Sequence, residues 1–585
     1  MGSELTTERL VVREWRLDDA AAALAIYGVD KVTRWLTPAM GQVADEAAMG
    51  LVLTLPTLAL GRNSHPNPAT AYVSLAPSVT AAGGRVIPLI NSGQTFNNTT
   101  FEGIPDGLGL KPVGNGSRYI DIYVTFEQSH VPFGPPPATQ FADFEDSSVQ
   151  LARLDLQTNE IVKLEEVLPP SAGFIRFCSA TMVGPAEGFD GYTFFVNEES
   201  VDWLPVPAGA TYSADPAIVP YRQAGLSVAI DTDEKTFAPL PGMGRLNHEN
   251  TVVVPGGWDD VVSLSGDDTF AAPASQLYLY RASSPEALTS DQGHLMAFQV
   301  TGTNAGPLAN PFDAQNDAND YLEINPGDTW TGRFIPVPDD IADGDTGVPP
   351  QTALENWSNE NNVFQFVRVE DIGYDPDSPR TVYFADTGST RIAEDPATGR
   401  LFRPGAAARP YYDSDGRVFK MVLNANDPTV VDSFSIVAQG KLQLQEPPVP
   451  PSTTPVVTVI DAGVGFVNPD NVGVGHNSLM VQEDSSGNND VWQHPIGTST
   501  WTKVASTTQT ATAETSGIVD ASKWLGAGWW ALDVQSHVNL PTPEGVDDGP
   551  FTWDGPSYPL GPLVGSEYFT RREDGQLLLM YIPGS

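Results

Sequence analysis

Short runs of alternating hydrophobic and polar residues recur along most of the chain, each followed by acidic or small polar residues and a turn. Such alternation gives a strand one buried and one exposed face. From about Thr70 onward the pattern occurs six times, and partner strands follow several of the copies. The copies span residues 119–129, 191–200, 261–268, 381–389, 477–486 and 528–536. The 54 glycines and 51 prolines among 585 residues favour many short strands over long helices. We therefore predict an all-β protein.

Repeats of strand, acidic turn and strand are typical of the blades of a β-propeller. A single blade cannot bury both of its faces, so the copies must pack radially around a central channel. Acidic residues that close the strands can then meet at that channel. The irregular spacing predicts long insertions at 202–231, 304–361 and 447–455. We predict a propeller of about six blades; the alternative is a β-sandwich with ordinary Asp and Ser turn residues.

The first forty residues follow a different pattern, in which a strand at 5–15 precedes a helix at 20–27. Thr7-Glu-Arg-Leu-Val-Val-Arg-Glu-Trp15 and Val32-Thr-Arg-Trp-Leu36 resemble the opening strand and helix of the GNAT acetyltransferases, over residues 5–44. That family's later Gly-rich pyrophosphate-binding turn has no counterpart, which argues against acetyltransferase activity. We expect a short α/β N-terminal appendage at 1–48 and the propeller domain at 70–585.

Acidic residues dominate the charge, with 73 Asp and Glu against 30 Lys and Arg and a net charge of -43. Such a surface repels phosphate backbones and anionic lipids, so we expect no binding to nucleic acid. The chain contains no run of about 18 apolar residues, so we predict no membrane span. Most acids should keep the surface solvated, while a minority could chelate hard cations, which prefer oxygen ligands.

The start is acidic where a signal peptide is basic, and the apolar run at 49–60 fits a buried strand or a relic of an export signal.

Two polar groupings lie at the edges of predicted strands. His248 and Glu249 place an imidazole beside a carboxylate. Arg368 and Glu370 are two residues apart, so they share one face of an extended strand. An arginine on the same face as a metal-binding glutamate could hold a phosphate that bridges to the metal. Each grouping alone also fits a plain surface hydrogen bond or salt bridge.

A third grouping combines an Asx-rich turn with two acids. Asn468-Pro-Asp-Asn471 is followed after one strand by Glu483 and Asp484. Carboxylates, amides and turn carbonyls together suit the six to eight oxygen ligands of calcium. Because all three groupings lie at strand edges of predicted blades, their joint occurrence favours a metal site.

These residues resemble the PhoX-type alkaline phosphatases, a family of exported six-bladed propellers. The resemblance runs from about Ile104 to the strand that carries Asp484. Glu127, which ends Tyr123-Val-Thr-Phe-Glu127, resembles a His-Glu strand end of the family, with Phe126 in place of the histidine. The other matching stretches are Ile104-Pro-Asp-Gly-Leu-Gly109, the Asn-Glu-Glu strand ending at Glu199, Asn247-His-Glu249, Arg368-Val-Glu370 with Tyr383-Phe384, and Pro469-Asp-Asn471 with Glu483-Asp484.

The resemblance implies hydrolysis of small phosphate esters at a site that combines calcium ions with a thiolate-bridged iron pair. It implies an extracellular or periplasmic location. The catalytic residues would be Arg368, as a phosphate clamp, with His248 and Glu249. The metal ligands would be Glu127, Glu199, Glu249, Glu370, Asp470, Glu483 and Asp484.

One departure from the family bears on the metals. The family's strand carries Cys-Glu-Glu, whereas this chain has Asn197-Glu-Glu, and a neutral amide cannot replace a bridging thiolate. The single cysteine, Cys178, could be recruited to the site, but we interpret it as a buried and inert thiol. We therefore expect calcium, while iron is in doubt. The alternatives to a metal-dependent phosphoesterase are an inactive calcium-binding propeller with a structural or binding role and a calcium-dependent lactonase or esterase.

Overall fold

A computed structural model describes residues 67–542 and 568–585 together with two short strands, β1 (Leu5–Thr6) and β2 (Val11–Val12). Within 67–542 it leaves out residues 93, 115–117, 128–146, 207–213, 219–220, 270–274, 314–317, 406, 486–488 and 509–512. The chain divides into two compact units, Met1–Ser64 and His65–Ser585, and the fold below is that of the second. Apart from β1 and β2, which pair with each other, the appendage predicted at 1–48 and the apolar run at 49–60 lie outside the described residues.

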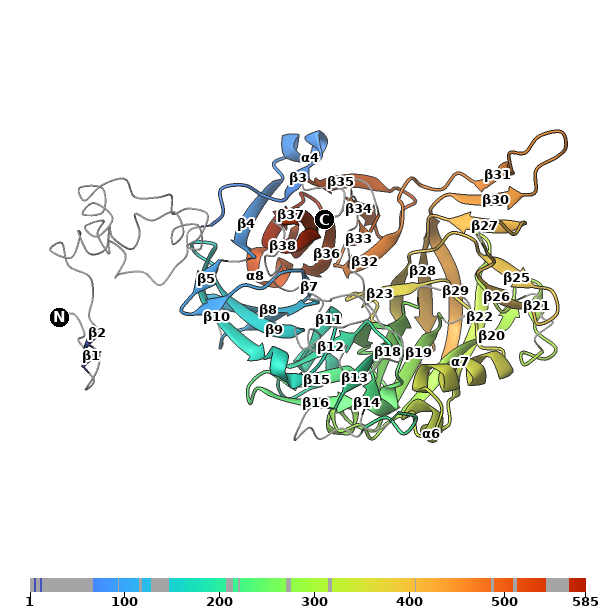
Figure 1. The fold of residues 1–585 in the computed structure, drawn as a ribbon, viewed down its shortest axis with the longest axis horizontal. Coiled ribbons are helices and arrows are strands. Elements are labelled where there is room, and N and C mark those ends of the chain that lie inside the picture. Colours follow the sequence, from blue (N-terminus) through green and yellow to red (C-terminus); the bar gives the residue numbers. More distant parts are fainter. Residues whose placement is uncertain are drawn as a thin grey trace. The chain divides into compact units, whose positions relative to one another are not determined.

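Six four-stranded antiparallel blades make up most of the described part of the second unit (Figure 1). In chain order the first three are β7 (Pro105–Pro112), β8 (Tyr119–Phe126), β9 (Ser148–Asp155) and β10 (Glu160–Leu168); β11 (Phe177–Val183), β12 (Thr193–Glu198), β15 (Ser227–Asp231) and β16 (Thr236–Leu240); and β17 (His248–Val253), β18 (Val261–Asp267), β19 (Leu277–Ala282) and β20 (His294–Thr303). The other three are β23 (Val369–Tyr374), β24 (Thr381–Asp386), β28 (Arg417–Leu423) and β29 (Val430–Gln439); β32 (Pro469–Val474), β33 (Ser478–Glu483), β34 (Asp490–Pro495) and β35 (Thr502–Thr507); and β36 (Ala513–Asp520), β37 (Trp529–Thr542), β38 (Tyr568–Tyr581) and β4 (Arg85–Asn91).

The first strands of the blades form a closed ring. In the order β7, β11, β17, β23, β32 and β36, each packs against the next, and β36 packs against β7. Figure 1 shows the six blades gathered around this central group of strands. The predicted all-β propeller is thereby confirmed, and the acidic strand ends of different blades meet at one channel.

Strands from both ends of the unit close the ring. β4, near its start, pairs along β38, near its end, and β3 (Val73–Leu75) pairs with the outer strand β35. Blades five and six are therefore built partly from residues more than 400 positions apart in the sequence. Such closure removes the free edge that an open ring of blades would leave.

Both faces of the blades are buried against neighbours, which explains their apolar strands. Residues 577–580 of β38 are four consecutive apolar side chains, and each is fully buried. One core layer contains stacked and edge-on phenylalanines of the third and fourth blades, among them Phe298, Phe366, Phe384 and Phe419. Aromatic rings in these arrangements add to the stabilisation from buried area.

Two of the three predicted insertions carry additional elements, and the one at 202–231 also contains the blade strand β15. β22 (Trp330–Pro336) pairs with both β20 and β29, so the third and fourth blades form one continuous sheet. The remaining elements are β5 (Thr95–Phe96), β6 (Thr99–Thr100), β13 (Trp203–Pro205), β14 (Tyr221–Gln223), β21 (Gly306–Pro307), β25 (Ala393–Asp395), β26 (Arg400–Phe402), β27 (Tyr411–Ser414), β30 (Leu442–Glu446), β31 (Val456–Asp461), α4 (Pro77–Ala81), α5 (Pro285–Thr289), α6 (Asp339–Ala342), α7 (Pro350–Glu360), α8 (Ser522–Leu525) and three single 3-10 turns. Among the described residues, every helix is too short or too polar to cross a membrane.

A buried ion pair fixes the segment from which β11 starts. Arg222 of β14 donates to both carboxylate oxygens of Glu198 at 2.6 Å and 2.7 Å, and both side chains are fully buried. The same carboxylate accepts the backbone N–H groups of Ile175 and Leu226, each at 3.1 Å. Ile175 directly precedes Arg176, so this pair sets where the chain enters the second blade.

Replacing Arg222 with alanine should destabilise the protein strongly, because it leaves the Glu198 carboxylate buried without its guanidinium. We expect Arg222→Ala to lower the free energy of unfolding by about 3–5 kcal/mol, measured by urea denaturation with tryptophan fluorescence. Lys235→Ala is the control: it removes a partly exposed ion pair with Glu165, which should cost at most about 1 kcal/mol. Similar losses in the two variants would contradict the assignment.

Candidate metal centre

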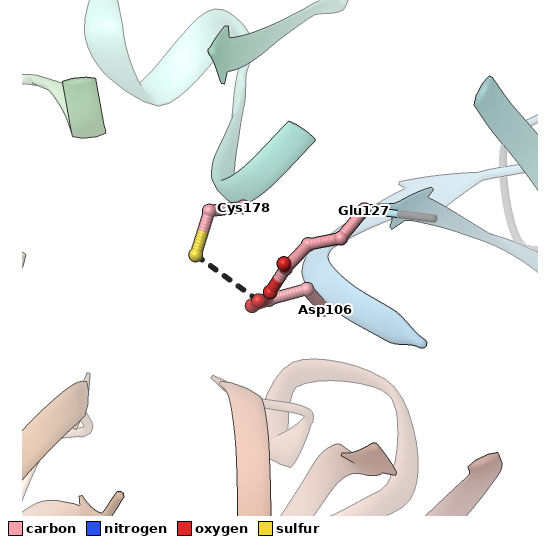
Figure 2. A group of neighbouring side chains, drawn as sticks. All are labelled: Asp106, Glu127 and Cys178. Carbon is pink, nitrogen blue, oxygen red and sulfur yellow. Dashed lines mark hydrogen bonds between the residues drawn. The ribbon is translucent and has the colours of Figure 1, made fainter. Parts of the chain in front are cut away.

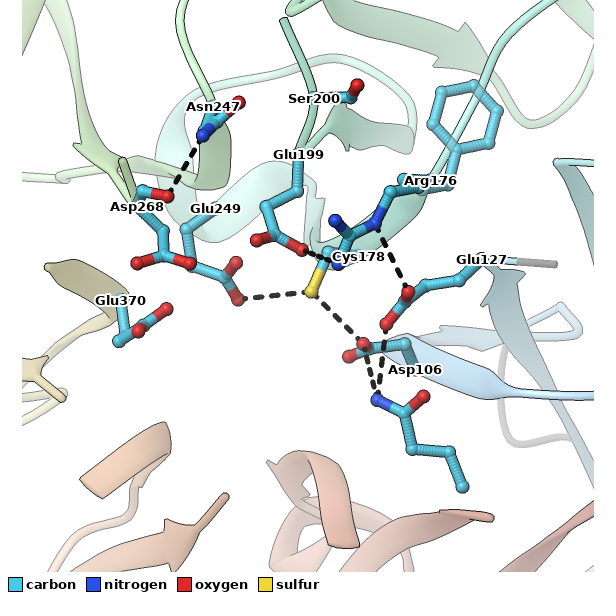
Figure 3. Close-up of polar contacts among 12 residues, drawn as sticks. Asp106, Glu127, Arg176, Cys178, Glu199, Ser200, Asn247, Glu249, Asp268 and Glu370 are labelled. Carbon is cyan, nitrogen blue, oxygen red and sulfur yellow. Dashed lines mark hydrogen bonds and ion pairs between the residues drawn. The ribbon is translucent and has the colours of Figure 1, made fainter. Parts of the chain in front are cut away.

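The second residue of each innermost strand carries an acidic or thiol side chain. These residues are Asp106, Cys178, Glu249, Glu370, Asp470 and Glu514, and we call them the ring residues. In the first five blades a shift of register follows at once, for example between Pro105 and Leu108. Such a bulge breaks the alternation of faces and redirects side chains. Figure 3 shows four of the ring residues turned toward one another.

A second set of residues follows the last position of the second strand in five blades. It comprises Glu127, Glu199, Asp268, Thr387 and Asp484. The backbone N–H of each donates to the carbonyl two positions before the ring residue of its own blade, at 2.9–3.1 Å; the acceptors are Ile104, Arg176, Asn247, Arg368 and Asn468. This repeated hydrogen bond holds the end of the second strand against the start of the first. Both sets therefore lie at the same end of the channel.

Cys178 lies between two groups of carboxylates. Its Sγ is 3.1 Å from Oδ2 of Asp106 and 3.4 Å from Oε1 of Glu249 (Figures 2 and 3). In each of two groups, Asp106–Glu127–Cys178 and Cys178–Glu199–Glu249, three ligand atoms lie within 4.8 Å of one another. Burial, followed by the negative charge of Asp106 and Glu249, raises the pKa of the thiol well above its ordinary value. A cation in either group would reverse that effect and favour the thiolate.

Arg176 joins the two groups from the second blade. Its Nη2 lies 3.0 Å from Oε2 of Glu199, and its Nε lies 3.5 Å from Oε2 of Glu127 (Figure 3). Arg176 adjoins the strand that carries Cys178, so one short segment supplies both the thiol and a positive charge. The guanidinium offsets part of the repulsion between the two glutamates.

Arg368 occupies the corresponding place in the fourth blade. Its Nε and Nη2 lie 2.6 Å and 2.7 Å from the two oxygens of Asp268, and Nη2 lies 3.2 Å from Oε1 of Glu370. Burial opposes ionisation of Asp268, but Arg368 outweighs it, so the pKa of Asp268 falls below its ordinary value. Thr387 donates its hydroxyl hydrogen to Glu370 and lies 3.0 Å from the carbonyl of Pro469.

The buried carboxylates at the channel fit a cation-binding site. Burial, and secondarily the charge of Glu127, raises the pKa of Asp106 to about 7. Burial likewise raises the pKa of Glu249, Glu370 and Asp470 well above their usual range, with neighbouring carboxylates adding to the shift. Oδ1 of Asp106 is buried and has no hydrogen-bond partner among the described residues. Carboxylates taken out of water need positive partners, and the two arginines do not match them in number.

The structure brings most of the predicted site residues together. These are Arg368, Glu127, Glu199, Glu249, Glu370, Asp470 and Asp484, whose charges act on one another at the channel. The carboxylate of Glu483 instead accepts N–H groups of Val467, Asp490 and Trp492 within its own blade. Asp484, the next residue, is the one that faces the ring.

His248 is held away from the ring. Its Nδ1 lies 2.7 Å from the hydroxyl of Ser265, and its Nε2 lies 3.0 Å from the carbonyl of Gly244. The carboxylate of Glu249 instead lies 3.4 Å from Sγ of Cys178 at the ring. The geometry supports Glu249 as a ligand and gives His248 a structural contact.

Asn197 and Cys178 differ from the places that the sequence interpretation gave them. Asn197 hydrogen-bonds to the carbonyl of Ser179 and the hydroxyl of Thr251, at 3.3 Å and 2.9 Å. Cys178, interpreted as an inert thiol, is the side chain that lies among the carboxylates. The structure thus places a sulfur donor beside the oxygen donors that the sequence predicted.

Several members of the site were not predicted: Asp106, Arg176, Asp268, Glu514 and Gln535. Nε2 of Gln535 lies 3.2 Å from carboxylate oxygens of both Asp106 and Glu127. A signal for the ring residues was present, because the innermost strand of most blades begins with an acid followed by a short polar or small residue, as in Asp106-Gly107, Glu249-Asn250 and Asp470-Asn471.

A family model described as alkaline phosphatase PhoX matches residues 195–523, more than half of the chain. The chain therefore belongs to the PhoX family of alkaline phosphatases, which confirms the resemblance seen in its sequence. No curated protein sequence matches the chain.

Among solved structures, PhoX of Pseudomonas fluorescens, in complex with vanadate as a transition state analogue, is similar over 89% of this chain and 98% of its own, with 14% identity and a TM-score of 0.52. A gluconolactonase of Xanthomonas campestris is similar over 89% of this chain and 98% of its own, with 10% identity and a TM-score of 0.31. The periplasmic gluconolactonase PpgL of Pseudomonas aeruginosa is similar over 71% and 87%, with 12% identity and a TM-score of 0.29. The likeness to PhoX supports the propeller fold.

Burial of His248 should make the free energy of unfolding depend on pH, and a variant without the imidazole should remove that contribution. Burial lowers the pKa of the imidazole to about 4, from an ordinary value of 6.5. The folded state thus favours the neutral ring, and this stabilisation is complete above pH 6.5 and lost as the pH falls toward 4, by up to about 3 kcal/mol. His248→Gln should show a smaller loss of unfolding free energy between pH 7 and pH 4.5 than the wild type, measured by urea denaturation. Equal losses would place His248 in solvent.

Proposed function

We propose that this chain is a metal-dependent phosphoesterase that hydrolyses small phosphate esters at the ring residues. One observation carries the proposal: Arg368 lies beside Glu370 and Asp268 among buried carboxylates that come from every blade. A guanidinium next to bound cations is the arrangement that holds a phosphoryl group. Membership of the PhoX family supports the same reaction. The vanadate bound by the P. fluorescens relative is consistent with it.

Two kinds of donor set support two kinds of metal. The groups that share Cys178 combine a soft sulfur with carboxylate oxygens, and such sets suit a transition metal such as iron. The opposite side of the ring has oxygen donors alone: Asp470, Asp484 and Glu514 lie close enough for Asp484 to raise the pKa of the other two, after burial. Oxygen-only sets suit calcium. We therefore propose both, with iron or a similar metal at Cys178. When bound, these cations would supply Lewis-acid polarisation of the phosphoryl oxygens.

The chain's own residues prepare the site for substrate. Asp268 fixes the plane of the Arg368 guanidinium through two hydrogen bonds. Thr387 orients Glu370. Because these groups are buried, their charges act in a medium less polar than water and are stronger for it. We also propose, from the family, that the protein works outside the cytoplasm.

Hydrolysis of p-nitrophenyl phosphate, sensitive to chelator, is the direct test. Purified protein should release p-nitrophenol, and treatment with EDTA should abolish the activity. Glu370→Ala should lower kcat/KM by at least about 100-fold, because it removes a ligand and a partner of Arg368. His248→Gln is the matched control and should retain hydrolysis. Chelator-resistant activity, or full activity in Glu370→Ala, would contradict the assigned site. Bound metal without turnover would indicate a binding propeller, and cleavage of lactones alone would indicate a lactonase.

The role of Cys178 is tested by metal content rather than activity. Cys178→Ser should reduce the transition-metal content of the purified protein, measured by mass spectrometry, because a hydroxyl is a poor substitute for a thiolate. Calcium should stay bound, since its donors are oxygens. Ser179→Ala, at the next position of the same bulge, is the control and should leave both metals unchanged. An unaltered transition-metal content in Cys178→Ser would exclude the thiol as a ligand.

A further inference from the structure

A separate group of carboxylates lies on the insertions associated with the third and fourth blades. Asp320 and Glu323 belong to the segment between β21 and β22, and Glu394 belongs to the β25–β26 hairpin. Each offers a carboxylate oxygen, and the three oxygens lie within 4.8 Å of one another. None of the three residues stands at a ring position. They are 3 to 74 residues apart in sequence, so the fold alone assembles them.

Asp320 carries an oxygen that the described residues do not satisfy. Its side chain is fully buried; Oδ1 accepts the backbone N–H of Leu322 at 2.7 Å, while Oδ2 is buried without a hydrogen-bond partner. Neither nearby arginine hydrogen-bonds to this oxygen: Arg400 donates to the carbonyl of Val363 at 2.8 Å while its Nη2 has no hydrogen-bond partner among the described residues, and Arg417 donates to Oε1 of Gln439 at 2.7 Å. A buried carboxylate oxygen without a donor is costly, so the vicinity of Asp320 favours a positive ligand.

The donor set and its burial point to a hard divalent cation. All three side chains supply oxygen ligands. Calcium prefers oxygen, whereas softer metals prefer sulfur or nitrogen. Asp320 is buried, Glu323 is half-buried and Glu394 is exposed. A cation can therefore reach the group from solvent on the side of Glu394, with Asp320 at its buried end.

We propose that Asp320, Glu323 and Glu394 form a calcium site, distinct from the channel, that fastens the β25–β26 hairpin to the segment before β22. The hairpin already contacts the same region, because the N–H of Leu401 donates to Oε1 of Gln365 at 2.8 Å. Asp320 forms a bridge with Gln365 as well. The ion adds a link at the exposed edge of a contact that buried Leu401 and Tyr321 already share in one hydrophobic core.

Terbium(III), which takes oxygen ligands as calcium does, can probe the site in the full-length protein with its channel metals in place. Buried Tyr321, next to Asp320, should sensitise terbium luminescence on excitation of tyrosine. Glu394→Gln, at an exposed position that should not disturb folding, and Asp320→Asn should each weaken this binding phase at least about 10-fold. Asp395→Asn is the matched control, since the Asp395 carboxylate serves the hairpin turn by accepting the N–H of Ala397, and it should bind terbium as the wild type does.

Calcium content and thermal stability complete the test. Each cluster variant should lose one calcium ion per chain, together with the rise in Tm that added calcium gives the wild type, while hydrolysis of p-nitrophenyl phosphate continues. Retained hydrolysis separates this site from the channel, so failure of one proposal does not imply failure of the other. Unchanged terbium binding and calcium content in Glu394→Gln, or the same weakening in Asp395→Asn, would overturn the proposal.

Discussion

Repulsion between buried carboxylates at the centre of the ring is the constraint on which the rest of the structure depends. Asp106, Glu249, Glu370 and Asp470 come from four different blades, and burial together with their mutual repulsion disfavours their ionised forms. Packing of the blades forces these groups together, because the first strands touch all the way around. Arg176 and, in the fourth blade, its counterpart offset part of this charge. Bound cations would offset the rest. Because metal binding relieves the repulsion between the crowded acids, that repulsion increases the affinity of the folded protein for metal.

The same local backbone structure recurs in successive blades and allows the centre to contain different kinds of metal ligand. A bulge follows the second residue of the innermost strand, and a backbone hydrogen bond ties the end of the second strand to the start of the first. The backbone geometry is thus repeated while the side chain is free to change. Cys178 brings sulfur to one side, and Thr387 brings a hydroxyl where its neighbours bring carboxylates. A nearly symmetric frame therefore holds a site whose two sides suit different metals.

The sequence predicted the architecture better than the site, for a physical reason. The six predicted repeats coincide with the second strands of the blades, which have long apolar runs. The innermost strands were not among them, since bulges and glycines break their alternation, as in β7 and β32. The sequence also does not show which of two adjacent side chains faces the site. For this reason Glu483 was grouped with Asp484, and His248 with Glu249. The place of Cys178 depends on contacts with two other blades, and no local pattern specifies those.

Closure of the ring by β4 and β38 has a consequence for the order of events in the cell. The ring residues extend from Asp106 in the first blade to Glu514 in the last, so only a fragment that spans all six blades contains the complete set. The centre can exist only once strands from opposite ends of the unit have met. Contacts so distant in sequence form late and slowly during folding. Metal binding therefore indicates that folding is complete. A chain that lacks β4 or β38 would be unable to assemble the centre, although neither strand supplies a ligand to it.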